Sequence, residues 1–147
     1  MNMSNSDTQF EGWIKSRAIR VARAGEGGNV TYANVAGWTK GSFGIWDARM
    51  QTTLGTLQLT TVTHLPTGYS LTVIPGLKFA AEAAEIAEKL ADWGALKTEI
   101  PKDLQRRFVA SLEAAGFKNY GLIADGQSVW TKDIVGEASE TSEGSRN

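Results

Sequence analysis

Hydrophobic and polar positions alternate most clearly in the middle of the chain, where two segments rich in β-branched or apolar residues flank a turn. The first segment covers residues 57–65, and the second, 69–74, has an apolar side chain at every other position from Tyr69. A period of two is typical of β-strands. Pro66 and Gly68 suit the second and fourth positions of a type I turn. The pattern therefore predicts an antiparallel β-hairpin.

After Pro75 and Gly76 the apolar spacing changes to alternating steps of four and three, which is typical of an amphipathic helix. The stripe consists of Phe79, Ala83, Ile86, Leu90 and Trp93. Small alanines flank it and would let the helix approach a sheet or a second helix closely. Pro101 then occupies a position that a first helical turn tolerates. A second stripe follows it, formed by Leu104, Phe108, Leu112 and Ala115. The spacing predicts two consecutive C-terminal helices, the second ending at Gly116.

The N-terminal segment, residues 10–24, fits both helix and strand. Thr8 and Glu11 match a capping box, in which the Thr hydroxyl and the Glu carboxylate bind backbone amides of the first turn. A helical projection gathers Phe10, Ile14, Ala18, Val21 and Ala22 on one side. The other side collects Trp13, Arg17, Arg20 and Arg23. Residues 17–23 could also alternate as a strand, but we predict an amphipathic helix that ends at Gly25.

Three further segments complete the predicted fold. Residues 30–38 fit a short helix or a strand, and we favour the helix. Residues 43–51 are predicted to form a strand, and 120–123 a short last strand. The apolar pattern changes phase within both 43–51 and 57–65, which indicates a β-bulge or a sheet covered on both faces. We therefore predict an α+β fold: an antiparallel sheet with an N-terminal amphipathic helix and two C-terminal helices packed on it.

Composition and charge divide the chain into one domain with two polar ends. We expect a flexible N-terminus over residues 1–8, a single α+β domain over 9–132 and a disordered acidic tail over 133–147. The net charge is −1, but residues 10–132 carry 14 Lys and Arg against 11 Asp and Glu. This modest excess is too small for a strong polyanion binder. With no long apolar run, we expect a cytoplasmic protein without a membrane partner.

Few motifs of known chemistry are present. The chain has no cysteine, so disulfides, thiolate nucleophiles and Cys-based zinc sites are excluded. Gly25, Gly27 and Gly28 do not complete a dinucleotide-binding motif, and Lys40 precedes Gly41 instead of following it as in a phosphate-binding loop. We expect no cofactor and no metal. His64 is the only histidine, and no local motif gives it a catalytic partner, so no catalytic residue is assigned.

The strongest candidate for a binding surface is the arginine face of the predicted first helix. The guanidinium groups of Arg17, Arg20 and Arg23 could pair with phosphates while Trp13 stacks on a base. A solvated helix face is the alternative explanation. Secondary candidates are Arg106 and Arg107 on the last helix, and His64 at the end of a strand.

These observations favour a small non-enzymatic binding module, with a regulatory role as one option, whose partner is nucleic acid or an acidic protein surface. A second hypothesis is a protein-interaction or inhibitor domain, or a homo-oligomer, that uses exposed aromatics among its five tryptophans. A third hypothesis is a small ligand binder or enzyme around His64, with Thr63, Asp47 and Tyr69 nearby.

Overall fold

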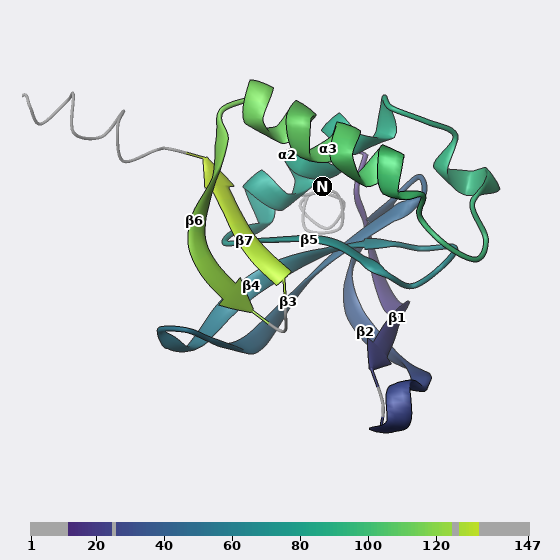
Figure 1. The fold of residues 1–147 in the computed structure, drawn as a ribbon. Helices are drawn as coiled ribbons and strands as arrows, with labels where there is room; N and C mark the ends of the chain where they lie inside the picture. Colours follow the sequence, from purple (N-terminus) through teal and green to yellow (C-terminus); the bar gives the residue numbers. More distant parts are fainter. Residues whose placement is uncertain (1–11, 25, 125–126, 133–147) are drawn as a thin grey trace, which may run out of the picture.

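The computed structural model describes residues 12–24, 26–124 and 127–132, and these residues are mostly β, with 51% of them in strands (Figure 1). The described strands are β1 (Ile14–Ala24), β2 (Val30–Lys40), β3 (Phe43–Thr52), β4 (Gly55–His64), β5 (Ser70–Ile74), β6 (Phe117–Ala124) and β7 (Gln127–Lys132). The α-helices are α2 (Leu77–Glu88) and α3 (Lys102–Ala114), and single 3-10 turns form η1 (Glu26–Gly28) and η2 (Trp93–Ala95). The predicted flexible N-terminus and acidic tail lie outside the described residues, as does the Thr8–Glu11 capping box.

Five of the strands close into a barrel. The strand order is β1-β2-β3-β4-β5-β7-β6, and the ring is completed where Thr52 of β3 pairs with Ala124 of β6. Neighbouring strands are antiparallel except β5 and β7, which run parallel and pair at Val73 and Val129. Two parallel strands cannot be joined by a tight turn. The chain therefore travels from β5 through both helices and β6 before it reaches β7.

The predicted α+β fold with an N-terminal helix is wrong, because the segment expected to form that helix is strand β1. Its pairing with β2 slips by one position between Ser16 and Ile19, which is a β-bulge. A bulge moves every later side chain to the opposite face. The apolar residues before and after the bulge therefore do not follow one alternating pattern. Their combined spacing resembles that of an amphipathic helix. After the bulge, Ile19 and Val21 are buried while Arg20 is exposed, as in an ordinary strand.

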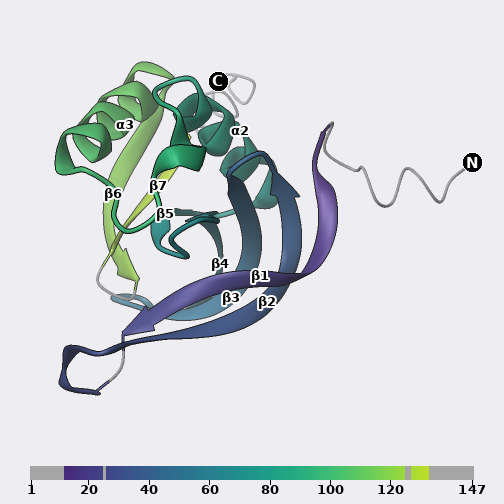
Figure 2. The same ribbon diagram turned by 90° about the vertical axis from the view of Figure 1, so that its right-hand side faces the viewer.

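The short helix favoured for residues 30–38 is also wrong, because these residues form most of β2. Here β1 and β2 make a long curved ribbon that reaches well beyond the barrel (Figure 2). The ribbon bends back on the turn after β4: the amide of Ala22 donates to the carbonyl of Gly68 at 2.8 Å. The Arg20 guanidinium donates to the Pro66 carbonyl at 3.2 Å. Strand β1 is therefore held against the barrel by hydrogen bonds to the turn between β4 and β5.

The predicted hairpin is confirmed, and two helices form close to the predicted places, but α2 ends at Glu88, before Leu90 and Trp93 of the predicted stripe, and β6 and β7 follow α3, so the helices are not C-terminal. Strands β4 and β5 pair antiparallel, and α3 buries the expected Leu104, Phe108 and Leu112. In α2 the predicted stripe residues Phe79 and Ile86 are only half-buried. The buried side is made of alanines, whose small side chains allow α2 to lie directly on the sheet, namely Ala80, Ala81, Ala83, Ala84 and Ala87.

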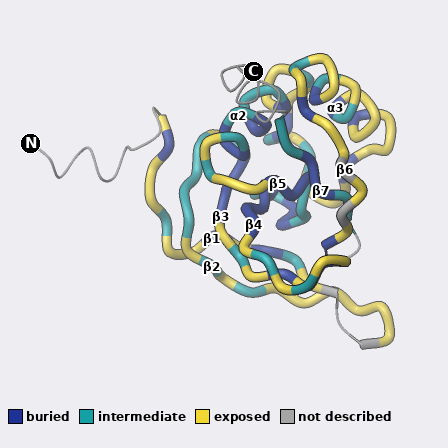
Figure 3. The backbone as a smooth tube through the Cα atoms, turned by 90° about the vertical axis from the view of Figure 1, so that its left-hand side faces the viewer, coloured by how far each residue is buried: buried dark blue, intermediate teal, exposed yellow. Residues whose placement is uncertain are grey.

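Residues 43–46 of β3 and 59–64 of β4 are buried without alternation, so this part of the sheet is covered on both faces (Figure 3). A register shift between Val62 and Thr63 adds an irregularity in β4, so both explanations of the phase changes apply. On one face, Ile45, Val62 and Ile74 pack against the helices. On the opposite face, each strand of the barrel contributes one side chain to a smaller cluster, formed by Met50, Leu59, Val73, Ala124 and Val129. A third cluster joins Ile19 and Val21 of β1 to Trp46 of β3, and it fixes the ribbon against the barrel.

Candidate functional site

The three arginines of the predicted site lie on one strand but do not share one face. Arg20 and Arg23 are separated by three positions in a regular part of β1, so their side chains project to opposite sides of the ribbon. Arg17 stands in the bulge between Ser16 and Ile19. All three are exposed, and Lys15 beside them is exposed as well. The structure thus gives a basic strand that is accessible from both sides, in place of a basic helix face.

Two aromatic rings accompany these cations. The Arg20 guanidinium carbon lies 4.2 Å from the centroid of the Tyr32 ring, and the Arg23 carbon lies 6.0 Å from that of Trp46. Both distances are within the range of cation–π contacts. Tyr32 is 46% exposed. The sequence does not indicate either aromatic residue as part of the site. Tyr32 and Trp46 come close to the arginines only because β2 pairs with β1 and β3 packs beside them.

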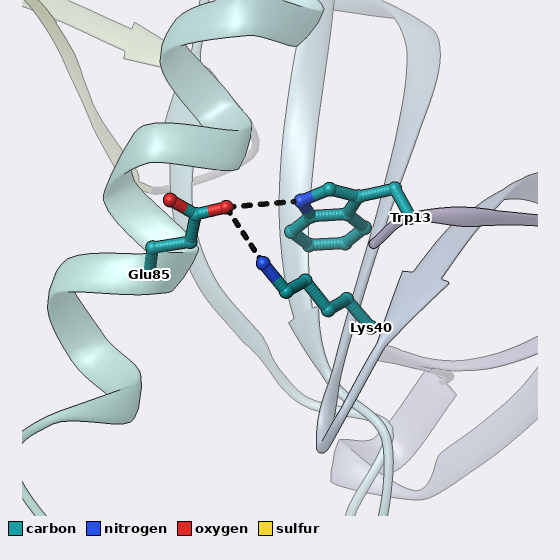
Figure 4. A network of polar contacts seen from close by, with 3 residues as sticks. All are labelled: Trp13, Lys40 and Glu85. Atoms are coloured by element: carbon teal, nitrogen blue, oxygen red, sulfur yellow. Dashed lines mark hydrogen bonds and ion pairs between the residues drawn. The ribbon is translucent and has the colours of Figure 1, made fainter. Parts of the chain in front are cut away.

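Trp13 is not available for stacking on a ligand. The residue is 1% exposed and lies in the core beside the helices. Its indole N–H donates to the Glu85 carboxylate at 3.4 Å, and Lys40 forms an ion pair with the same oxygen at 3.0 Å (Figure 4). This contact joins the start of β1 and the end of β2 to α2. Trp13 therefore has a structural position, and the predicted stacking role would require the ring to leave the core.

The bulge in β1 creates a shallow depression of about 560 Å³. It is lined by Lys15, Ser16, Arg17, Ala36, Gly37, Trp38 and Asp47. Gly37 has no room for a side chain, because an added Cβ would lie 2.2 Å from the carbonyl oxygen of Ile45 and 2.8 Å from the Cβ of Trp46; its glycine lets β2 approach β3 closely. Two cations stand at the rim of this depression against one exposed carboxylate, so its charge favours an anion.

A second concavity, of about 540 Å³, lies between the ribbon and the barrel. Five strands contribute to its lining, which consists of Val21, Ala22, Arg23, Trp46, Met50, Thr61, Ser70 and Gln127. We call it the Trp46 groove. It opens on the side of the sheet away from the helices, because Trp46 and Thr61 alternate with Ile45 and Val62, which pack against the helices. Arg23 belongs both to this groove and to the basic strand.

Polar groups in the Trp46 groove are held in place by their neighbours. The Trp46 indole N–H donates to the Thr63 hydroxyl at 3.0 Å, and the Ser70 hydroxyl donates to the Gln127 side-chain carbonyl at 2.7 Å. Thr61 is only 2% exposed, and its hydroxyl oxygen is buried without a hydrogen-bond partner. A buried hydroxyl without a partner costs free energy, commonly about 1–3 kcal/mol. Such a group in the wall of a concavity is a ready contact for a bound molecule.

His64 is fully buried and does not line a cleft. Its Nε2 lies 2.8 Å from the Trp93 carbonyl oxygen, which can only accept, so Nε2 carries the proton. Nδ1 lies 2.9 Å from the Thr67 hydroxyl, which donates to it. Burial lowers the pKa of His64 below its ordinary value of 6.5; Lys97 lowers it further, and the bond to Trp93 opposes both. His64 therefore acts as a neutral link between the β4–β5 turn and η2.

The secondary candidates Arg106 and Arg107 lie on α3, apart from the basic strand. Arg106 is 3.8 Å from Asp103 in an exposed ion pair, and Arg107 donates to the Leu90 carbonyl at 3.1 Å. The structure therefore does not combine them with Arg17, Arg20 and Arg23 into one site. Within the described residues, no three His, Asp or Glu side chains come close enough to hold a metal ion.

The comparisons with known proteins give no relative: no protein family, no curated protein and no solved structure matches this chain. In the part of the chain that the structure describes, no helix has the length and apolar character that crossing a membrane requires. Any inference about the function of the candidate site therefore rests on the geometry of the site alone.

Proposed function

We propose that the protein binds single-stranded nucleic acid along the β1–β2 ribbon. The observation that carries this proposal is the basic strand: Lys15, Arg17, Arg20 and Arg23 are all exposed on β1. An extended strand rises by roughly 3.3 Å per residue, so the first and last of these cations lie roughly 25 Å apart. That spacing offers several separate phosphate contacts, and phosphate contacts supply most of the affinity of non-specific binding.

Aromatic side chains beside the cations favour a single strand over a duplex. Unpaired bases can stack on exposed rings, whereas paired bases are already stacked on one another. Tyr32 offers such a ring next to Arg20. Five-stranded barrels of the OB type bind oligonucleotides, and the barrel described above has that architecture. This likeness of architecture is an analogy and adds weight only together with the residues of the ribbon.

The structure gives the competing hypotheses fewer features than the ribbon offers. A protein-interaction domain with tryptophan anchors needs exposed indoles, but Trp13, Trp46, Trp93 and Trp130 are buried and the fifth tryptophan, Trp38, is half-buried. An enzyme or ligand site around His64 needs an accessible imidazole, and this ring is enclosed by Thr67 and the Trp93 carbonyl. An acidic protein partner would use the same cations as a nucleic acid, and the experiment below separates the two.

The test is an anisotropy titration of a labelled 20-nucleotide single strand, and of the matching duplex, at two salt concentrations. We expect tighter binding of the single strand and a log–log salt slope of about −0.7 for each phosphate contacted. Replacing Lys15→Gln together with Arg17→Gln removes two cations that do not line the Trp46 groove. This variant should reduce the magnitude of the slope by about 1.4.

The matched control is Lys102→Gln with Arg106→Gln, which removes one exposed lysine and one exposed arginine from α3. It should bind like the wild type. A folded wild type that binds no single strand even at low salt would contradict the proposal and leave the acidic protein partner. An equal or larger loss in the α3 variant would show that net charge or another surface accounts for the binding.

A further inference from the structure

We propose that the Trp46 groove is a binding site for one nucleobase. The inference rests on the proposed function, because the base would belong to the strand whose phosphates lie on the ribbon. Arg23 connects the two, since it lies on the basic strand and also lines the groove. A nucleotide whose phosphate contacts Arg23 would have its base directed into the groove.

The size and lining of the groove suit a planar heterocycle. Its volume of about 540 Å³ is typical of small-molecule sites, which commonly measure about 300–1,000 Å³. Val21, Trp46 and Met50 supply apolar and aromatic walls. The Arg23 guanidinium carbon is 6.0 Å from the centroid of the Trp46 ring, so a cation stands at the same wall. Apolar walls with a few fixed polar groups are the usual composition of ligand sites.

The polar groups give the groove its preference for a base over a purely apolar molecule. The buried Thr61 hydroxyl has no partner and can both donate and accept. Gln127 contacts Ser70 through its side-chain carbonyl at 2.7 Å, and its amide nitrogen makes only a long contact of 3.5 Å to the Ser70 carbonyl. A primary amide offers a donor and an acceptor side by side. The edges of nucleobases carry the complementary pattern.

The groove also lies where two neighbouring strands of the sheet, β5 and β7, share few backbone pairs. Strands β5 and β7 pair through their backbones only at Val73 and Val129 among the described residues, and Ser70 and Gln127 bridge the space beyond. The same two side chains line a further depression on the helix side of the sheet, beside Ile100 and Phe108. The Ser70–Gln127 pair therefore separates two concavities, and a base that bonds to Gln127 has to compete with Ser70.

The experiment is a titration of the full chain with each of the four common nucleoside 5′-monophosphates, followed by tryptophan fluorescence and by equilibrium dialysis. Ribose 5-phosphate, which has the same phosphate and sugar but no base, is the control ligand. We expect at least one mononucleotide to bind and to change the fluorescence, and ribose 5-phosphate to bind at least about tenfold more weakly. Equal binding of ribose 5-phosphate would overturn the inference, because it would reduce the site to a phosphate contact.

Two isosteric variants make the test specific. Thr61→Val removes the hydroxyl in the groove, and Thr72→Val removes another buried hydroxyl that also has no partner but lies outside the groove. Loss of one neutral hydrogen bond should weaken mononucleotide binding about fivefold in Thr61→Val. The Thr72→Val variant should bind as the wild type does. Equal effects of the two variants would contradict the inference.

A third variant, Gln127→Leu, keeps the test decisive if Thr61→Val does not fold. Gln127→Leu should change the order of preference among the four mononucleotides, because the amide contacts the edge of the base; an unchanged order would count against the groove. Failure of the proposed function is separately visible. If Lys15→Gln with Arg17→Gln leaves oligonucleotide binding intact while Thr61→Val weakens mononucleotide binding, the ribbon proposal falls and the groove stands.

Discussion

At the scale of single residues, His64 shows how one buried ring can make the stability of the protein depend on pH. Its two ring nitrogens already have partners that suit the neutral form. Because burial lowers its pKa in the folded protein below 6.5, the unfolded chain takes up a proton first as the pH falls. The stabilising contribution of the neutral ring is complete above pH 6.5. It decreases as the pH drops from 6.5 towards the folded pKa.

We therefore expect the free energy of unfolding to decrease between pH 7.5 and pH 5, measured by urea denaturation at each pH. His64→Gln cannot be protonated, so this variant should lose stability at pH 7.5 but show a smaller decrease on acidification. A variant with the same decrease as the wild type would assign the pH dependence to other groups.

The sequence could predict the candidate arginines but not their geometry. Arg17, Arg20 and Arg23 were identified by type and spacing, and a helix placed them on one face. The strand distributes them around the ribbon and adds Lys15 and Tyr32 as neighbours. Thr61 and Gln127 carried no signal in the sequence, because a single threonine or glutamine is common. They become candidate site residues only because five strands bring them together in the Trp46 groove, where their burial and contacts can be seen.

At the scale of elements, α2 is fitted to the sheet by the small size of its buried side chains. Ala84 is 1% exposed and lies in the cluster that joins α2 to β3 and β4. Ala84→Leu should overpack this contact and destabilise the protein by about 1–3 kcal/mol. Lys78→Leu, an exposed position of the same helix, is the control for an added leucine and should have little effect. Thermal melts that shift equally for both variants would show that the alanine contact is not tightly packed.

Elements specified by a strong local signal were predictable, even though β4 and β5 change register between Val62 and Thr63, and elements without such a signal were not. The β4–β5 hairpin is specified by a turn of four residues, and α3 by a stripe that returns every four residues. In β1 the bulge between Ser16 and Ile19 breaks the alternation that identifies a strand. In β2 no residue is buried, and its small and polar side chains give only a weak alternation. Tertiary pairing decided both cases.

At the scale of the whole molecule, closure of the barrel depends on partners that are far apart in the sequence. Thr52 and Ala124 pair across more than half the length of the described domain, and Val73 pairs with Val129 across both helices. Nothing in the local pattern of either segment specifies these pairs. The candidate groove inherits this property, since its wall combines residues from Val21 to Gln127. Neither the closed barrel nor the groove could be predicted from local periodicity.

The narrow attachment of the last hairpin has a consequence for the exchange of its amide hydrogens. Among the described residues, β6 joins β3 by one pair at Ala124, and β7 joins β5 by one pair at Val129, whereas β3 and β4 pair along their whole lengths. Local opening follows the weakest boundary of a sheet. The amides of Ala124 and Gln127 should therefore exchange with deuterium before those of β3 and β4. Because Gln127 lines the groove, a bound mononucleotide should slow the exchange of these amides. Ligand binding would then stabilise the barrel where its strands share the fewest backbone pairs.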